Sequence, residues 1–168
     1  MTNTPQPERD FEQALRFLAE KMPDAKDLEK PTLIHSVRVG VYLYNHNCDI
    51  SICIAGLLHD LVEDSDIKLE DLRGKFGEKV AELVSANTKN NSLPKDQIYI
   101  ELLERCINSG EEASIIKAAD TLDNLIYYRA IDDQEGISNM LNFGRILLHL
   151  KPENFENEIF AELQKEIG

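Results

Sequence analysis

The residues best suited to chemistry are two polar pairs at the end of an apolar run, His59-Asp60 and Glu63-Asp64. In a helix, each member of the first pair shares a face with the acid four positions later. Carrying ionised side chains to the edge of a core is costly, and a bound cation removes that cost. We therefore interpret the first pair as metal ligands and the second pair as acids that act on what the metal binds. The alternative is a solvated helix end whose charges face water.

Two further residues could complete a metal site from other helices. His35 lies early in a helix that the apolar spacing predicts from Thr32 onward. Asp120 follows the small and apolar residues 115–119, and Asn124 shares its face one turn later. The alternative for Asp120 is a helix cap or an ion-pair partner. Two imidazoles with two carboxylates form a mixed donor set that suits manganese, iron or zinc better than magnesium.

The elements that must position these residues are helices. Apolar residues recur every three or four positions in segments separated by Pro, Gly and polar turns, and no alternating strand pattern of useful length occurs. The segment from about Asp49 to Glu63 is apolar nearly all round, which is typical of a buried central helix. We expect one all-α domain of about eight or nine helices over residues 1–168, with residues 1–7 as a frayed tail.

Composition restricts the class of protein and of partner. The 168 residues carry a formal net charge of −13, which argues against binding nucleic acid through its phosphate backbone. We expect neither a membrane span nor a signal peptide, because no apolar run is long enough and the N-terminal residues are polar. The three cysteines, Cys48, Cys53 and Cys106, lack metal-type spacing. They predict reduced thiols in a cytoplasmic protein.

Several motifs together carry a resemblance to a known family. His35, His59-Asp60 and Asp120 resemble the H…HD…D signature of the HD superfamily of metal-dependent phosphohydrolases. Residues 57–65, LLHDLVEDS, resemble the LLHDxxEDT stretch of the RelA/SpoT-type hydrolase domain. Two further stretches are similar to its FGxxVAxLV and IKLADRLHNL motifs, FGEKVAELV at 76–84 and IKAADTLDNL at 116–125. The resemblance covers roughly residues 33–128.

This resemblance implies an HD helical fold, one divalent metal that is usually manganese, and hydrolysis of the 3′-pyrophosphate of guanosine tetra- or pentaphosphate (ppGpp or pppGpp). Iron, zinc and magnesium are the other metals considered. The motifs assign the metal to His35, His59, Asp60 and Asp120. They assign the attacking water to Glu63 and Asp64, and substrate contacts to Lys117 and Asn124. We expect a stand-alone hydrolase, without the synthetase, TGS or ACT segments of longer relatives.

Two departures from the family pattern leave the substrate open. Ser36 follows the first histidine where the family usually has proline, and the family's basic nucleotide-binding segment is reduced to Lys21, Lys26 and Lys30 among acids. Fewer cations would hold a highly charged nucleotide less tightly. Two alternatives therefore stand beside the favoured function. One is an HD-type nucleotide phosphatase with a different substrate, and the other is a catalytically silent module that binds a nucleotide or a partner. The oligomeric state is open.

Overall fold

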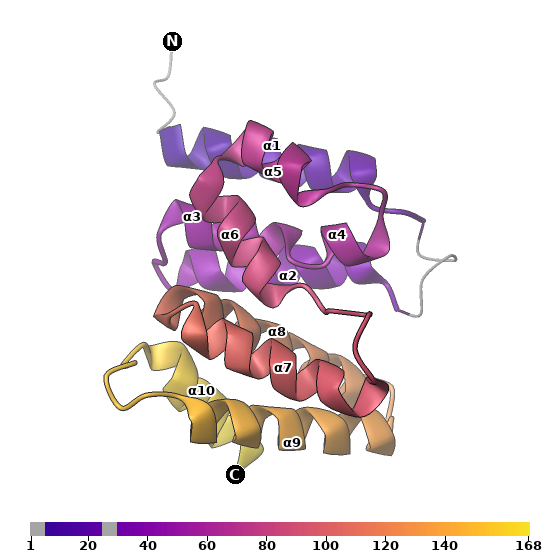
Figure 1. The fold of residues 1–168 in the computed structure, drawn as a ribbon, viewed down its shortest axis with the longest axis vertical. Helices are drawn as coiled ribbons and strands as arrows, with labels where there is room; N and C mark the ends of the chain where they lie inside the picture. Colours follow the sequence, from indigo (N-terminus) through magenta and orange to yellow (C-terminus); the bar gives the residue numbers. More distant parts are fainter. Residues whose placement is uncertain (1–5, 25–29) are drawn as a thin grey trace. The chain divides into compact units, whose positions relative to one another are not determined.

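The computed structural model describes residues 6–24 and 30–168, and over these residues it contains ten α-helices and no strands (Figure 1). The all-α prediction is confirmed. The count exceeds the expected eight or nine because α4 (Leu61–Asp64) is a separate single turn. Residues 1–5 of the expected tail lie outside the described residues, whereas Gln6 and Pro7 already belong to the first helix. Within the described residues, no helix is both long and apolar enough to cross a membrane.

The helices fall into two compact units, residues 1–88 and 89–168. The single domain that we expected from the sequence therefore stays a prediction. The first unit contains six helices: α1 (Gln6–Lys21), α2 (Thr32–Asn45), α3 (Ile50–Leu58), α4, α5 (Leu69–Phe76) and α6 (Glu78–Asn87). Helix α3 is the centre of this unit, since it packs against α1, α2 and α6. Residues 52–58 of α3 are all buried, which confirms the central helix predicted from its apolar composition.

Helices α2 and α3 pack closely because each carries a glycine where the other approaches. A Cβ atom at Gly40 of α2 would lie 2.9 Å from Cβ of Leu57, and a Cβ atom at Gly56 of α3 would collide with Cδ1 of Leu43. The missing side chains let the two backbones approach. These glycines therefore set the spacing between the helix that carries His35 and the helix that ends just before His59.

The second unit contains α7 (Lys95–Asn108), α8 (Glu111–Ala130), α9 (Gln134–Leu150) and α10 (Glu158–Ile167). Helix α8 packs against the other three, and most of residues 113–125 are buried. Helix α9 begins at Gln134, directly after its cap. Asp133 caps it by accepting from the Gly136 backbone N–H at 3.0 Å, and Gly136 leaves room for the Tyr128 ring. This glycine serves close packing and does not break the helix.

Candidate metal centre

Three of the four predicted metal ligands lie together in the first unit. His35 is in the first turn of α2, and His59 and Asp60 form the turn between α3 and α4. The Asp60 carboxylate lies between the two rings, with Oδ2 3.5 Å from Nε2 of His35 and Oδ1 3.2 Å from Nε2 of His59. The ring centroids are 5.3 Å apart. The Asp60 carboxylate thus contacts each imidazole nitrogen through a different oxygen, and the three residues offer the nitrogen and oxygen donors of a transition-metal site.

The hydrogen bonding of His59 prepares its Nε2 atom for a metal. Its Nδ1 atom lies 2.7 Å from the backbone carbonyl oxygen of Gly56. A carbonyl oxygen only accepts, so Nδ1 carries a proton, and in this tautomer Nε2 is the nitrogen left to bind a metal. The same arrangement, a second-shell acceptor on the far ring nitrogen, is typical of metal-bound histidines. His59 is fully buried and His35 is 2% exposed, so both rings are held by the surrounding core.

The backbone after His59 differs from the continuous helix predicted to Glu63. Helix α3 ends at Leu58, and the chain turns before the short helix α4. The Asp60 carbonyl accepts from the backbone N–H groups of Glu63 at 3.1 Å and Asp64 at 3.0 Å. The Ser65 hydroxyl then ends α4 by donating to the Leu61 carbonyl at 2.6 Å. The metal-ligand pair and the acidic pair therefore belong to two short segments joined by a turn.

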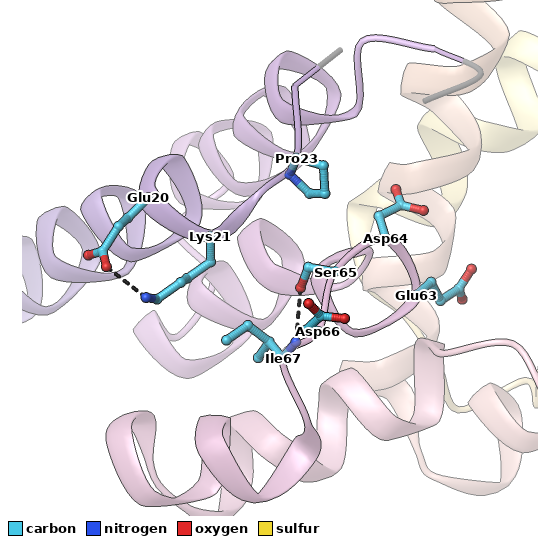
Figure 2. Close-up of a pocket in the computed structure, with 8 residues that line it drawn as sticks. All are labelled: Glu20, Lys21, Pro23, Glu63, Asp64, Ser65, Asp66 and Ile67. Atoms are coloured by element: carbon cyan, nitrogen blue, oxygen red, sulfur yellow. Dashed lines mark hydrogen bonds and ion pairs between the residues drawn. The ribbon is translucent and has the colours of Figure 1, made fainter. Parts of the chain in front are cut away.

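Glu63 and Asp64 line a cleft of about 580 Å³ in the first unit, within the usual range for small-molecule sites. Figure 2 shows both acids extending from α4, with Glu20 and Lys21 of α1 on the other side. The remaining lining residues are Pro23, Ser65, Asp66 and Ile67. The cleft therefore combines the predicted catalytic acids with one lysine.

Lys21 is the one basic residue among the described residues that line this cleft, and it is paired. Its Nζ lies 2.7 Å from Oε1 of Glu20, and this hydrogen bond is the main cause of the lowered pKa of Glu20. Of the lysines considered for the basic segment, Lys26 lies outside the described residues. Sequence reasoning missed Glu20, because nothing in the pattern places the end of α1 beside residues 63–67. That proximity arises only from tertiary packing.

The fourth predicted ligand and both predicted substrate contacts lie together in the second unit, on α8. Lys117 Nζ is 3.0 Å from Oδ2 of Asp120. Asn124 Nδ2 donates to Oδ1 of the same carboxylate at 2.6 Å and to the Asp120 backbone carbonyl at 3.0 Å. The Lys117 side chain is 5% exposed and that of Asp120 is 14% exposed. The two residues expected to contact substrate are therefore both directed at the carboxylate of a predicted metal ligand.

Comparison with known proteins agrees with the motifs. A guanosine-3′,5′-bis(diphosphate) 3′-pyrophosphohydrolase MESH1 from Drosophila melanogaster is 38% identical over 99 residues, which are 58% of this chain and 55% of that protein. The MESH1 of Danio rerio is 35% identical over 118 residues, 67% of this chain and 66% of that protein. The pyrophosphohydrolase of Aquifex aeolicus is 31% identical over 129 residues, 74% of this chain but 18% of that protein. This chain thus spans less than two thirds of the length of each of these curated relatives.

A solved structure described as a metazoan ortholog of SpoT that hydrolyses ppGpp matches with a TM-score of 0.75 and 26% identity, covering 100% of this chain and 99% of that one. A structure from Listeria monocytogenes matches with a TM-score of 0.67 and 25% identity over 79% of this chain. A family model described as HD domain matches residues 14–140. The chain belongs to the HD domain family.

Proposed function

We propose that this protein is a metal-dependent phosphohydrolase that acts on a nucleotide, with guanosine-3′,5′-bis(diphosphate) as the first candidate substrate and its 3′-pyrophosphate as the group removed. The observation that carries the proposal is the arrangement of the Asp60 carboxylate between the Nε2 atoms of two buried histidines, in a chain of the HD domain family. The names of the relatives support the choice of substrate.

The proposed ligands are His35, His59, Asp60 and Asp120, the set that the sequence motifs assign. The nitrogen and oxygen donors fit manganese, with iron, zinc and magnesium as the other candidates. A divalent metal held there would acidify a coordinated water and offset negative charge on phosphate oxygens. The Gly56 carbonyl supports this assignment, since it holds His59 in the tautomer that offers Nε2.

Glu63 and Asp64 are the proposed catalytic residues of this chain. Both line the cleft that begins just after the ligand pair, so they are placed to meet a substrate bound there. We assign Glu63 to accept the proton of the attacking water at its carboxylate and Asp64 to orient that water. A carboxylate serves as a general base when it lies within hydrogen-bond reach of the proton it accepts.

Lys21 is the proposed phosphate contact within the cleft, and Glu20 limits the charge that it offers. This pairing favours one second candidate function, a phosphatase of the same chemistry whose substrate carries fewer charges than guanosine tetraphosphate. Either substrate is a small anion bound by a strongly acidic protein, so local cations must create attraction in a negative field.

The buried thiols of Cys53 and Cys106 support a reducing compartment, and we propose a cytoplasmic location for the protein.

A substrate panel with manganese-loaded protein tests the proposal. The panel contains guanosine tetraphosphate, deoxynucleoside monophosphates and dinucleotide phosphates, and the release of pyrophosphate and orthophosphate is measured separately. Pyrophosphate from the first compound is the expected result. Orthophosphate from another compound would support the second candidate. Tight metal binding without turnover on any compound would contradict both and favour a silent binding module.

A further inference from the structure

We propose that Asn124, together with Lys117, is a positioning residue that holds the Asp120 carboxylate in one orientation for a divalent metal. This inference rests on the proposed function, in which Asp120 is a ligand. It adds a positioning role to the substrate contacts that the sequence motif suggested for both residues. The contacts that carry it all lie on one helix of the second unit.

The three side chains form a clamp, defined as Lys117, Asp120 and Asn124. Their spacing of three and four residues puts them on one face of α8. Each carboxylate oxygen is held by a different donor, since Lys117 Nζ lies 3.0 Å from Oδ2 and Asn124 Nδ2 lies 2.6 Å from Oδ1. Two donors on opposite oxygens fix both the position and the rotation of the carboxylate.

Asn124 is itself held in place. Its Nδ2 group also donates to the Asp120 backbone carbonyl at 3.0 Å, so the amide is tied to the helix as well as to the carboxylate. The side chain is also largely buried, at 9% exposed. A donor that is already fixed loses little entropy when it orients its acceptor, which is the property required of a residue that supports a ligand.

The clamp is compatible with metal ligation. An ionised carboxylate offers about four lone-pair positions, and the two clamp bonds use two of them. Hydrogen bonds of this kind around a ligating carboxylate are a regular part of metal sites, and their loss typically costs about 10–100-fold in metal affinity or activity. The burial of Lys117 is explained by the same pairing, because a buried cation needs an anionic partner.

The pairing also lowers the positive charge that Lys117 can offer to a substrate. The positive charge of Lys117 is already balanced by Asp120, so it offers less attraction to a phosphate than a solvated lysine would. Replacing Asn124 tests the clamp better than replacing Lys117, because the change at Lys117 has two opposing effects on metal binding. Replacing Lys117 would remove a donor, which weakens metal binding, and would also remove a positive charge near the cation, which strengthens it.

The experiment measures Mn²⁺ affinity of the full chain, freed of metal by a chelator, from the electron paramagnetic resonance signal of unbound Mn²⁺. Asn124→Leu should raise the Kd about 10–100-fold. Ser114→Ala is the matched control, because this buried serine of α8 also donates to a carbonyl four residues earlier, at 2.9 Å from Gly110, but contacts no carboxylate. It should leave the Kd unchanged.

A double-mutant cycle shows whether Asn124 acts through Asp120. In an Asp120→Asn background, which itself should bind Mn²⁺ weakly, adding Asn124→Leu should cause no further loss. If Asn124→Leu does not fold, as judged by its thermal unfolding, Asn124→Ala takes its place. An unchanged Kd in the Asn124 variant would overturn the clamp. An unchanged Kd for Asp120→Asn alone would instead overturn the proposed ligand set.

Discussion

The Nδ1 atom of His59 donates to the carbonyl oxygen of Gly56, three residues earlier, at 2.7 Å. Gly56 therefore serves two functions in the first unit. Its backbone carbonyl orients the imidazole, and its missing side chain lets α3 pack against Leu43 of α2. Gly56 thus links the orientation of His59 to the spacing between α2, which carries His35, and α3, which ends just before His59.

Closing the gap between α2 and α3 should weaken both the fold and metal binding. In Gly40→Ala, the new Cβ would lie 2.9 Å from Leu57 Cβ and 3.2 Å from its Cα, atoms that cannot move without the backbone. Overpacking of this kind costs about 1–3 kcal/mol, against a gain of up to about 1 kcal/mol in helix propensity. We expect a net loss of stability in urea unfolding of the metal-free protein, and a higher Kd for Mn²⁺.

Gly74→Ala is the matched control for this substitution. Gly74 lies within α5, and a Cβ atom there would meet nothing within 4 Å. Only the propensity gain remains, so this variant should be more stable by up to about 1 kcal/mol, with an unchanged Kd for Mn²⁺. Equal stability changes in the two variants would mean that the α2–α3 spacing is not as tight as the contacts imply.

Asp60→Ala should remove both bound metal and activity. Its carboxylate lies near both histidine Nε2 atoms, at 3.5 and 3.2 Å, and alanine offers no donor in its place. Elemental analysis of the purified variant should find the metal lost, and the substrate panel should find no turnover. Circular dichroism serves to check that the helices remain. A variant that kept full activity would contradict the assigned ligands.

Glu63→Gln should keep the metal but slow turnover by about two to four orders of magnitude if this carboxylate accepts the proton of water. The amide has nearly the same shape, so metal content and KM should change little. Asp66→Asn is the control, because Asp66 lines the same cleft outside the α4 acid pair. Its kcat should stay within a few-fold of the parent. Similar losses in both variants would indicate a general effect of cleft charge instead of proton transfer.

Local features of this protein were predictable from sequence, and its tertiary ones were not. Apolar spacing placed the buried α3 and α8, since each helix buries a face that its own residues define. The His59-Asp60 pair could be identified as a candidate site because ionised side chains at the edge of a core lose water, which is costly unless a partner or a cation compensates. The contact between Asn124 and the Asp120 carboxylate could also be predicted from the sequence, since the two residues are one helical turn apart.

The features that were missed depend on partners distant in sequence. The break at His59 and Asp60 leaves no sign in the apolar pattern, which continues through Leu61 and Val62. The role of Gly136 is also hidden in the sequence, because only the position of the Tyr128 ring shows that a glycine is needed there for packing. The pairing of Glu20 with Lys21 is local, but its place beside residues 63–67 is set by how α1 packs.

Releasing Lys21 from Glu20 should strengthen the binding of an anionic substrate. Over residues 6–24 and 30–168, the lysine is the one basic residue that lines the cleft, and its charge is shared with a carboxylate 2.7 Å away. In Glu20→Gln, that charge becomes available to phosphate, so KM should fall by a few-fold, on the order expected for one exposed ion pair, with kcat unchanged. Lys21→Ala should change KM in the opposite direction.

Glu12→Gln controls for net charge, because Glu12 pairs with Arg16 on the same helix and does not line the cleft. The Glu20 effect should also depend on pH with a defined sign. Lys21 lowers the pKa of Glu20, so the carboxylate stays ionised at neutral pH and loses its charge only as pH falls through that lowered pKa. The KM difference between parent and Glu20→Gln should therefore be constant around pH 7 and disappear in acid. A difference that grew as pH fell would rule out this ion pair as its cause.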